Sequence, residues 1–220
     1  MEKYAIVIAG ISGVGKTTVA DRLIEDLGYL EMSRSATTRS PRGDGRDDEY
    51  VYITEEEFRR SIAEGGVAEY TEYGGNLYGT RKCELERIFD SGKHPILVLD
   101  YNGAASLKKS LDYPVYAFYV YTDLAIAEER LRLRDLASGC ERARASFEKR
   151  CRQNIDDFSV LHTMAELFDC YVENEEVGKC ASEIIAAIDK LRCGEEAMSL
   201  FEKVMITEDF RRKASERLCT

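Results

Sequence analysis

The 220-residue sequence contains only two histidines, and none of its seven cysteines forms a C-x-x-C pair. Histidine and cysteine therefore do not occur at the spacings that zinc sites need, and a zinc site is not expected. We interpret the cysteines as reduced thiols of an intracellular protein. They lie at positions 83, 140, 151, 170, 180, 193 and 219.

Long apolar runs are also missing. No stretch approaches the roughly 18 residues of a membrane span, and the N-terminal residues lack the basic-then-apolar layout of a signal peptide. Only three prolines occur, with no proline-rich linker, internal repeat or low-complexity segment. With 44% hydrophobic residues the chain can bury a sizeable core, so we expect one compact, cytoplasmic α/β domain.

Positively charged residues are outnumbered, because the chain has 31 lysines and arginines but 41 aspartates and glutamates, which gives a net charge of −10. This balance disfavours nucleic acid or an anionic membrane as the main partner. The basic residues that are present gather in residues 34–46 and 130–152. Such runs are either solvated faces or local cationic pockets.

One motif carries the strongest chemical signal. Residues 10–17 read Gly-Ile-Ser-Gly-Val-Gly-Lys-Thr, after an apolar run at 4–9 and before a helical pattern at 18–27. This order indicates a strand, a phosphate-binding loop and a helix, with backbone N–H groups and the helix N-terminus facing phosphate oxygens. Lys16 would reach the β- and γ-phosphates, and Thr17 would coordinate Mg²⁺. A ligand-free glycine turn would not need the Lys-Thr pair.

A second cationic loop follows at residues 33–46. Arginine presents a planar fork that matches phosphate oxygens, so Arg39 and Arg42, with the hydroxyl of Ser35, suit a second phosphate. The alternative is an ordinary polar surface loop.

Hydrophobic periodicity and turn residues predict the remaining elements. A capping box at Thr54 and Glu57 starts one helix, and residues 74–76 join two strands into a hairpin. Strands are expected at 29–32, 50–53, 67–73, 77–80, 94–100, 115–120 and 168–174. Helices are expected at 55–64, 81–91, 123–136, 146–162, 176–191 and 195–204, with a charged tail at 208–220.

Polar residues at strand positions are the next candidates. Glu69, Tyr78 and Thr80 on the hairpin could read a polar ligand, although tyrosines in strands are common and most strand glutamates face water. Asp100 ends a buried strand, where α/β proteins hold ligands. It could equally cap the helix that follows.

Arginines also mark a possible lid. Arg130 and Arg134 share one helix face, residues 138–144 break the helical pattern, and Arg150 lies on the next helix. Two helices with a polar break could close arginines over a transferring phosphoryl group. An exposed helical hairpin would look similar.

Four blocks together resemble the guanylate kinase family, from the phosphate loop to about Leu191. They are residues 10–17, residues 35–42 with Tyr50, Glu69 with residues 76–80, and residues 96–103. The resemblance implies a P-loop NTPase three-layer fold with a parallel central sheet, a small mixed β subdomain for GMP and a helical lid. It divides residues 1–192 into a core (about 1–33, 81–125 and 160–192), an NMP-binding region (about 34–80) and a lid (about 126–159), and leaves 193–220 as a helical extension of unknown role.

The resemblance also implies roles for single residues in ATP-dependent phosphorylation of GMP, and of dGMP. Lys16, Arg39, Arg130, Arg134 and Arg150 would be catalytic, and Thr17 with Asp100 would hold Mg²⁺. ATP would contact Gly10, Ile11, Ser12, Gly13, Val14, Gly15, Lys16, Thr17, Thr18 and Asn174. GMP would contact Ser35, Arg39, Arg42, Tyr50, Glu69, Tyr78, Thr80 and Asp100.

Several departures from the family pattern leave alternatives open. Val98 stands where the family usually has an acid that helps the Mg²⁺ shell, and Ile11 replaces a proline. The loop before Tyr50 is a residue short, and the lid is longer and lacks the usual Arg-Gly start. A related kinase for another phosphorylated acceptor, or an inactive binding module of the same family, would also fit these changes.

Overall fold

The computed structural model describes residues 2–41, 50–73, 75–135 and 141–218. The chain forms two compact units, one of residues 1–7 and 23–115 and the other of residues 8–22 and 116–220. The first contains the predicted acceptor-binding residues, and the second contains the phosphate loop and the predicted lid.

A five-stranded sheet has the order β2-β7-β1-β8-β9. Strand β2 pairs in parallel with β7, and β8 pairs in parallel with β9. The apolar run of β1 is completely buried, as expected for a parallel strand that is covered on both faces. The strands are β1 (Ala5–Ala9), β2 (Leu30–Met32), β7 (His94–Val98), β8 (Val115–Tyr121) and β9 (Cys170–Glu173).

A second, mixed sheet of four strands in the order β4-β3-β6-β5 belongs to the first unit. The predicted hairpin is present, with β5 (Val67–Tyr73) antiparallel to β6 (Asn76–Arg81). Strand β4 (Tyr50–Tyr52) was also expected. Strand β3 (Ser35–Thr37) was not, because its polar sequence carries no apolar run; it forms by pairing with β4 and β6 and buries Ala36 and Thr37.

Three helices complete the first unit: α2 (Glu55–Ala63), α3 (Lys82–Asp90) and α4 (Tyr101–Ser110). The capping box of α2 is formed by Thr54 and Glu57, as predicted. Phe58 of α2 packs with Ala36 and Leu77 in a small core beneath the mixed sheet. The side chain of Asp100 caps α4 by accepting a hydrogen bond of 2.7 Å from the N–H of Gly103.

The second unit contains the start of α1 (Lys16–Leu27), followed later in the chain by α5, α6, α7 and α8. The prediction for α6 was wrong at its start, because the helix already begins at Glu141 within the expected break. The Glu-Arg-Ala-Arg-Ala sequence there consists of good helix formers. The bounds are α5 (Leu124–Asp135), α6 (Glu141–Val160), a 3₁₀ helix (Leu161–Leu167) and α7 (Val177–Arg192).

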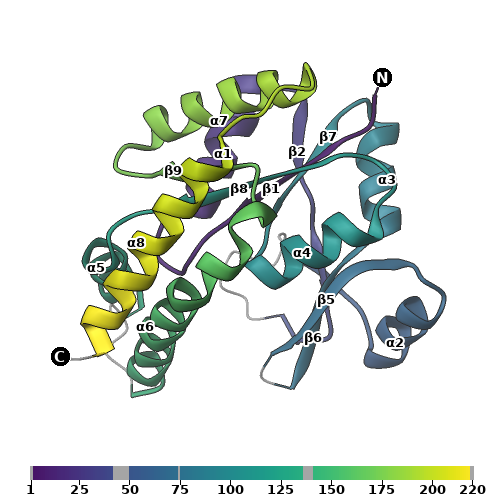
Figure 1. Ribbon diagram of the computed structural model, residues 1–220. Helices are drawn as coiled ribbons and strands as arrows, with labels where there is room; N and C mark the ends of the chain where they lie inside the picture. The colour runs from purple at the N-terminus through teal and green to yellow at the C-terminus, as the bar shows by residue number, and fades with distance from the viewer. Residues whose placement is uncertain (1, 42–49, 74, 136–140, 219–220) are drawn as a thin grey trace. The chain divides into compact units, whose positions relative to one another are not determined.

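The C-terminal segment differs most from expectation. A single helix, α8 (Leu200–Leu218), replaces the short helix and charged tail. Its charges pair along the helix, as between Arg211 and Glu208, while Phe210 and Ala214 are buried. Helix α8 runs along α6 (Figure 1). No helix in the described ranges is both long and apolar enough to cross a membrane.

Candidate nucleotide-binding site

The loop between β1 and α1 requires glycine at three positions. Gly10, Gly13 and Gly15 have φ angles of 149°, 91° and 88°, which other residues rarely adopt. A Cβ at Gly10 would lie 2.2 Å from the carbonyl oxygen of Val120, and one at Gly13 would lie 2.4 Å from that of Ala127. The loop is therefore packed closely against β8 and α5.

Lys16 reaches back across this loop. Its ammonium group donates hydrogen bonds of 2.8 Å to the carbonyl of Gly10 and 2.9 Å to that of Ile11. The side chain is half-buried, whereas Thr17 and Thr18 in the first turn of α1 are exposed. A cation and the N-terminus of a helix thus lie at one point, the combination that suits a polyphosphate.

Two buried asparagines hold the same loop. Asn154 of α6 pairs with Ser12 through two hydrogen bonds: its Oδ1 accepts from the Ser12 N–H (2.8 Å), and its Nδ2 donates to the Ser12 carbonyl (2.9 Å). Asn174, after β9, donates 2.7 Å to the carbonyl of Val14. The sequence prediction missed Asn154. Its one signal is an amide four residues before Phe158, on the buried side of a helix.

Asn174 was expected to contact ATP. Its side chain is 2% exposed and lies against the loop, and its Oδ1 has no hydrogen-bond partner among the described residues. Arg130 donates to the Asn174 carbonyl over 3.4 and 3.5 Å. Arg134 is exposed and Arg150 half-buried, and both belong to the same unit as the loop.

The first unit contains a pocket that brings together five of the predicted acceptor residues. Val98, one of the departures from the family pattern, also lines this pocket. Arg42, another predicted acceptor residue, lies outside the described residues. The predicted residues that line the pocket are Ser35, Tyr50, Glu69, Tyr78 and Asp100.

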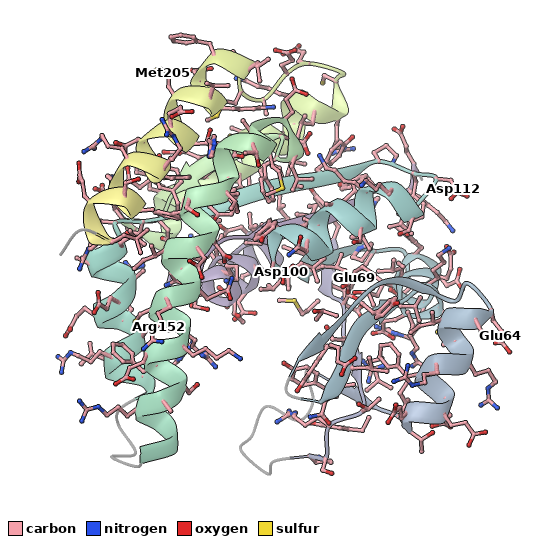
Figure 2. All side chains as sticks on the ribbon, turned by 60° about the horizontal axis from the view of Figure 1, so that its bottom comes forward. Glu64, Glu69, Asp100, Asp112, Arg152 and Met205 are labelled. Atoms are coloured by element: carbon pink, nitrogen blue, oxygen red, sulfur yellow. The ribbon has the colours of Figure 1, made fainter. Side chains whose placement is uncertain are left out.

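Glu69 is the most unusual group in this pocket, because it is a carboxylate that is only 7% exposed. It faces Thr80 across the β5–β6 ladder and accepts a hydrogen bond of 2.7 Å from the Thr80 hydroxyl. Asp100 lies close by (Figure 2), and a Cβ on Gly103 would be 3.4 Å from Asp100 Oδ1 and 3.5 Å from Glu69 Oε2. Two acidic side chains therefore converge above Gly103.

Burial raises the pKa of Glu69; the Thr80 hydrogen bond lowers it, the charge of Asp100 raises it, and the net shift is upward from the ordinary value of 4.5. A carboxylate held this way is short of hydrogen-bond donors. A ligand that supplies N–H groups would relieve the cost of burying its charge.

Arg39 belongs to the same unit as this pocket. Its guanidinium lies 5.2 Å from the centre of the Tyr50 ring and donates a long hydrogen bond of 3.4 Å to the Tyr52 hydroxyl. Its Nε and Nη1 are buried and have no hydrogen-bond partner in the described part of the chain. A cation with unused donors suits an anionic ligand.

Comparison with known proteins is decisive for the family. The guanylate kinase family model matches residues 2–191. The chain belongs to the guanylate kinase family. It is 33% identical to a guanylate kinase of Lactobacillus delbrueckii subsp. bulgaricus over 186 residues (84% of this chain, 87% of the relative). It is 37% identical to one of Porphyromonas gingivalis over 186 residues (83% and 95%).

A solved guanylate kinase from Anaplasma phagocytophilum has the same fold, with a TM-score of 0.59 and 24% identity, over 90% of this chain and 89% of that one. The predicted P-loop kinase fold with a parallel central sheet is thus confirmed. The family match ends at residue 191, so all of α8 lies beyond the part of the chain that the guanylate kinase model describes.

Proposed function

We propose that this chain transfers the γ-phosphoryl group of ATP to GMP and to dGMP, giving ADP and the corresponding nucleoside diphosphate. The observation that carries the proposal is the buried carboxylate of Glu69 beside Thr80 and Asp100. Guanine offers donors at N1–H and N2–H₂, whereas adenine has no donor at either place. AMP would bring no donor to the buried carboxylate, and this cost makes the site selective.

The phosphate of GMP would be held by residues of the same unit. Arg39 supplies unused guanidinium donors, while Ser35, Tyr50 and Tyr78 supply hydroxyl groups at the pocket. Arg42 completes this set in the proposal. Fixing the acceptor phosphate in position lowers the entropic part of the barrier.

ATP would bind at the glycine loop, with its phosphates facing Lys16 and the N-terminus of α1. Arg130, Arg134 and Arg150 belong to the same unit and would neutralise charge on the phosphoryl group in transfer. No general base is needed, because the attacking phosphate oxygen is already ionised. Closure of the lid would exclude water and suppress hydrolysis of ATP.

The proposed reaction uses Mg²⁺ with ATP. The exposed hydroxyl of Thr17, next to Lys16 at the start of α1, is the type of oxygen ligand that this ion prefers. Asp100 is the second proposed ligand, with one carboxylate oxygen engaged in capping α4. The ion would neutralise negative charge on the phosphates of ATP. We also propose a cytoplasmic location.

A comparison of acceptors tests the function. ADP formation from ATP and Mg²⁺ should be measured with GMP, dGMP, AMP, UMP and CMP at equal concentrations. The proposal predicts turnover with the two guanine nucleotides and little with the others. Turnover restricted to an acceptor without guanine would contradict the role of Glu69, and failure with all five despite ATP binding would identify a binding module.

A further inference from the structure

We propose that Asn154 is a positioning residue of the phosphate loop, which fixes the loop's peptide planes so that the N–H groups of Gly13 and Gly15 face the nucleotide. The inference rests on the proposed function only in taking ATP as the loop's ligand. Asn154 belongs to α6 and is separated from Ser12 by 142 residues in sequence.

The first step concerns the Ser12 backbone. Asn154 accepts from its N–H at 2.8 Å and donates to its carbonyl at 2.9 Å, so both polar atoms of this residue are held from one side. The amide is 3% exposed, and a buried amide with both ends paired has little freedom to turn away. Ser12 is therefore clamped.

The second step follows from peptide geometry. In a trans peptide the carbonyl of one residue and the N–H of the next point in opposite directions. The Ser12 carbonyl points at Asn154, so the N–H of Gly13 points the other way. The Ile11 carbonyl accepts from Lys16 while the Ser12 N–H faces Asn154, which is the same alternation.

A second asparagine, Asn174, holds the next part of the loop in the same way. The side-chain amide of Asn174 donates a hydrogen bond of 2.7 Å to the Val14 carbonyl. By the same peptide geometry, the N–H of Gly15 points away from Asn174. The carbonyls of Ser12 and Val14 thus each accept a hydrogen bond from an asparagine that lies outside the loop. The glycine that follows each of these carbonyls has a positive φ angle, 91° at Gly13 and 88° at Gly15, and without restraint these flexible residues could rotate their N–H groups away. The two amides remove that freedom before ATP binds.

Asn154 also connects the loop to the helix of a proposed catalytic arginine. Arg150 lies one turn before Asn154 on α6, on the same side of the helix. The clamp therefore keeps α6 in register with the phosphate loop.

Two substitutions separate positioning from packing. Asn154→Ala removes both hydrogen bonds and the side-chain volume, whereas Asn154→Leu removes the hydrogen bonds but fills similar space. Gln153→Ala is the matched surface control, since Gln153 is exposed on the same helix and its side chain donates a hydrogen bond to Asp157. Phe210→Leu is the stability control, because the buried ring of Phe210 stacks on Phe158 of α6 and belongs to the core.

The readouts are KM for ATP, KM for GMP, the melting temperature and calorimetric binding of ADP. We expect both Asn154 variants to weaken ADP binding and raise KM for ATP by about tenfold, the effect of losing one or two hydrogen bonds, while KM for GMP stays within about twofold. Gln153→Ala should match the wild-type protein, and Phe210→Leu should lower the melting temperature alone.

Restoration of ADP binding by Asn154→Leu to within about twofold of wild type would overturn the proposal, because packing would then suffice. Equal losses in Asn154→Ala and Phe210→Leu would overturn it as well. Calorimetry needs no turnover, so the test is independent of the acceptor. A wild-type protein that binds ADP but does not phosphorylate GMP would contradict the proposed function, and weaker ADP binding in both Asn154 variants would still support the clamp.

Discussion

Thr80 donates a hydrogen bond of 2.7 Å to Glu69 directly across the β5–β6 ladder, and both side chains are buried. Thr80 satisfies only part of the capacity of this carboxylate to accept hydrogen bonds. A ligand that brings N–H donors to this buried carboxylate would therefore bind it more favourably than water does.

Glu69→Gln should reduce kcat/KM for GMP by at least about 100-fold, because an amide offers one acceptor in place of two charged ones and opposes guanine with its own donor. Steady-state kinetics with GMP varied will measure this. Since burial and Asp100 raise the pKa of Glu69, the wild-type KM for GMP should also rise as the pH falls and the carboxylate becomes protonated.

The same variant should not destabilise the protein at neutral pH. A raised pKa means that the folded state binds the proton more tightly than the unfolded chain, so charged Glu69 costs stability above its pKa, and glutamine removes that cost. A melting temperature at pH 7 equal to or above the wild-type value is expected. A marked decrease in the melting temperature would show that Glu69 has a structural role. An unchanged KM for GMP would contradict its role in binding guanine.

Arg39→Ala should raise KM for GMP by at least about tenfold, because charge-assisted hydrogen bonds to phosphate are lost. KM for ATP should not change, since the phosphate loop does not depend on this residue. Arg59→Ala is the control: Arg59 is exposed and pairs only with Glu55 in the described structure. A KM for GMP that is the same in both variants would remove Arg39 from the acceptor site.

Phe210→Ala should lower the free energy of unfolding by about 3–5 kcal/mol, the usual cost of deleting a buried aromatic ring. Phe210 is 2% exposed and stacks on Phe158 with ring centres 4.4 Å apart, so α8 completes the core of its unit. Urea unfolding of the full chain will measure the loss. Phe201→Ala on the same helix is the control, since Phe201 is 73% exposed. Equally small losses of unfolding free energy in the Phe210→Ala and Phe201→Ala variants would mean that α8 contributes little to the stability of the protein.

Glu84 should contribute stability that depends on pH. Burial raises its pKa, but hydrogen bonds from Arg87 and Arg34 outweigh burial and lower the pKa to about 2. The unfolded chain therefore binds the proton more tightly, so the stabilisation is complete above 4.5 and is lost as the pH falls towards 2. Glu84→Gln should be destabilised at pH 7 and approach wild type in acid. Glu56→Gln, at an exposed position, should track wild type throughout; a pH-independent Glu84→Gln deficit would contradict the account.

Local signals predicted much of this molecule. The loop at residues 10–17, the capping box at Thr54 and the β5–β6 hairpin are each specified by neighbouring residues, and all three are present. The sequence also indicated Glu69 and Asp100, and the structure brings them to one pocket. These features need no information from distant parts of the chain.

Other features depend on distant partners, and no local signal could specify them. Strand β3 is polar and forms because β4 and β6 supply its hydrogen bonds. Helix α8 carries many charged residues, and the place of its buried residue Phe210 depends on aromatic partners in β8, β9 and α6. In the sequence, nothing distinguishes Asn154 from other polar residues, and its role depends on the hydrogen bonds that the fold lets it form with Ser12. Tertiary packing overrides local pattern at such positions.

Transfer of label from [γ-³²P]ATP tests the central claim most directly. ATP, Mg²⁺ and GMP should be incubated with the wild-type protein, with Lys16→Ala and with Glu69→Gln, and the labelled products separated. The account predicts that wild type places the label in the β-phosphate of GDP, one for each ADP formed. Both variants should do so far more slowly. Label released only as inorganic phosphate, or label in GDP at the same rate in all three proteins, would contradict it.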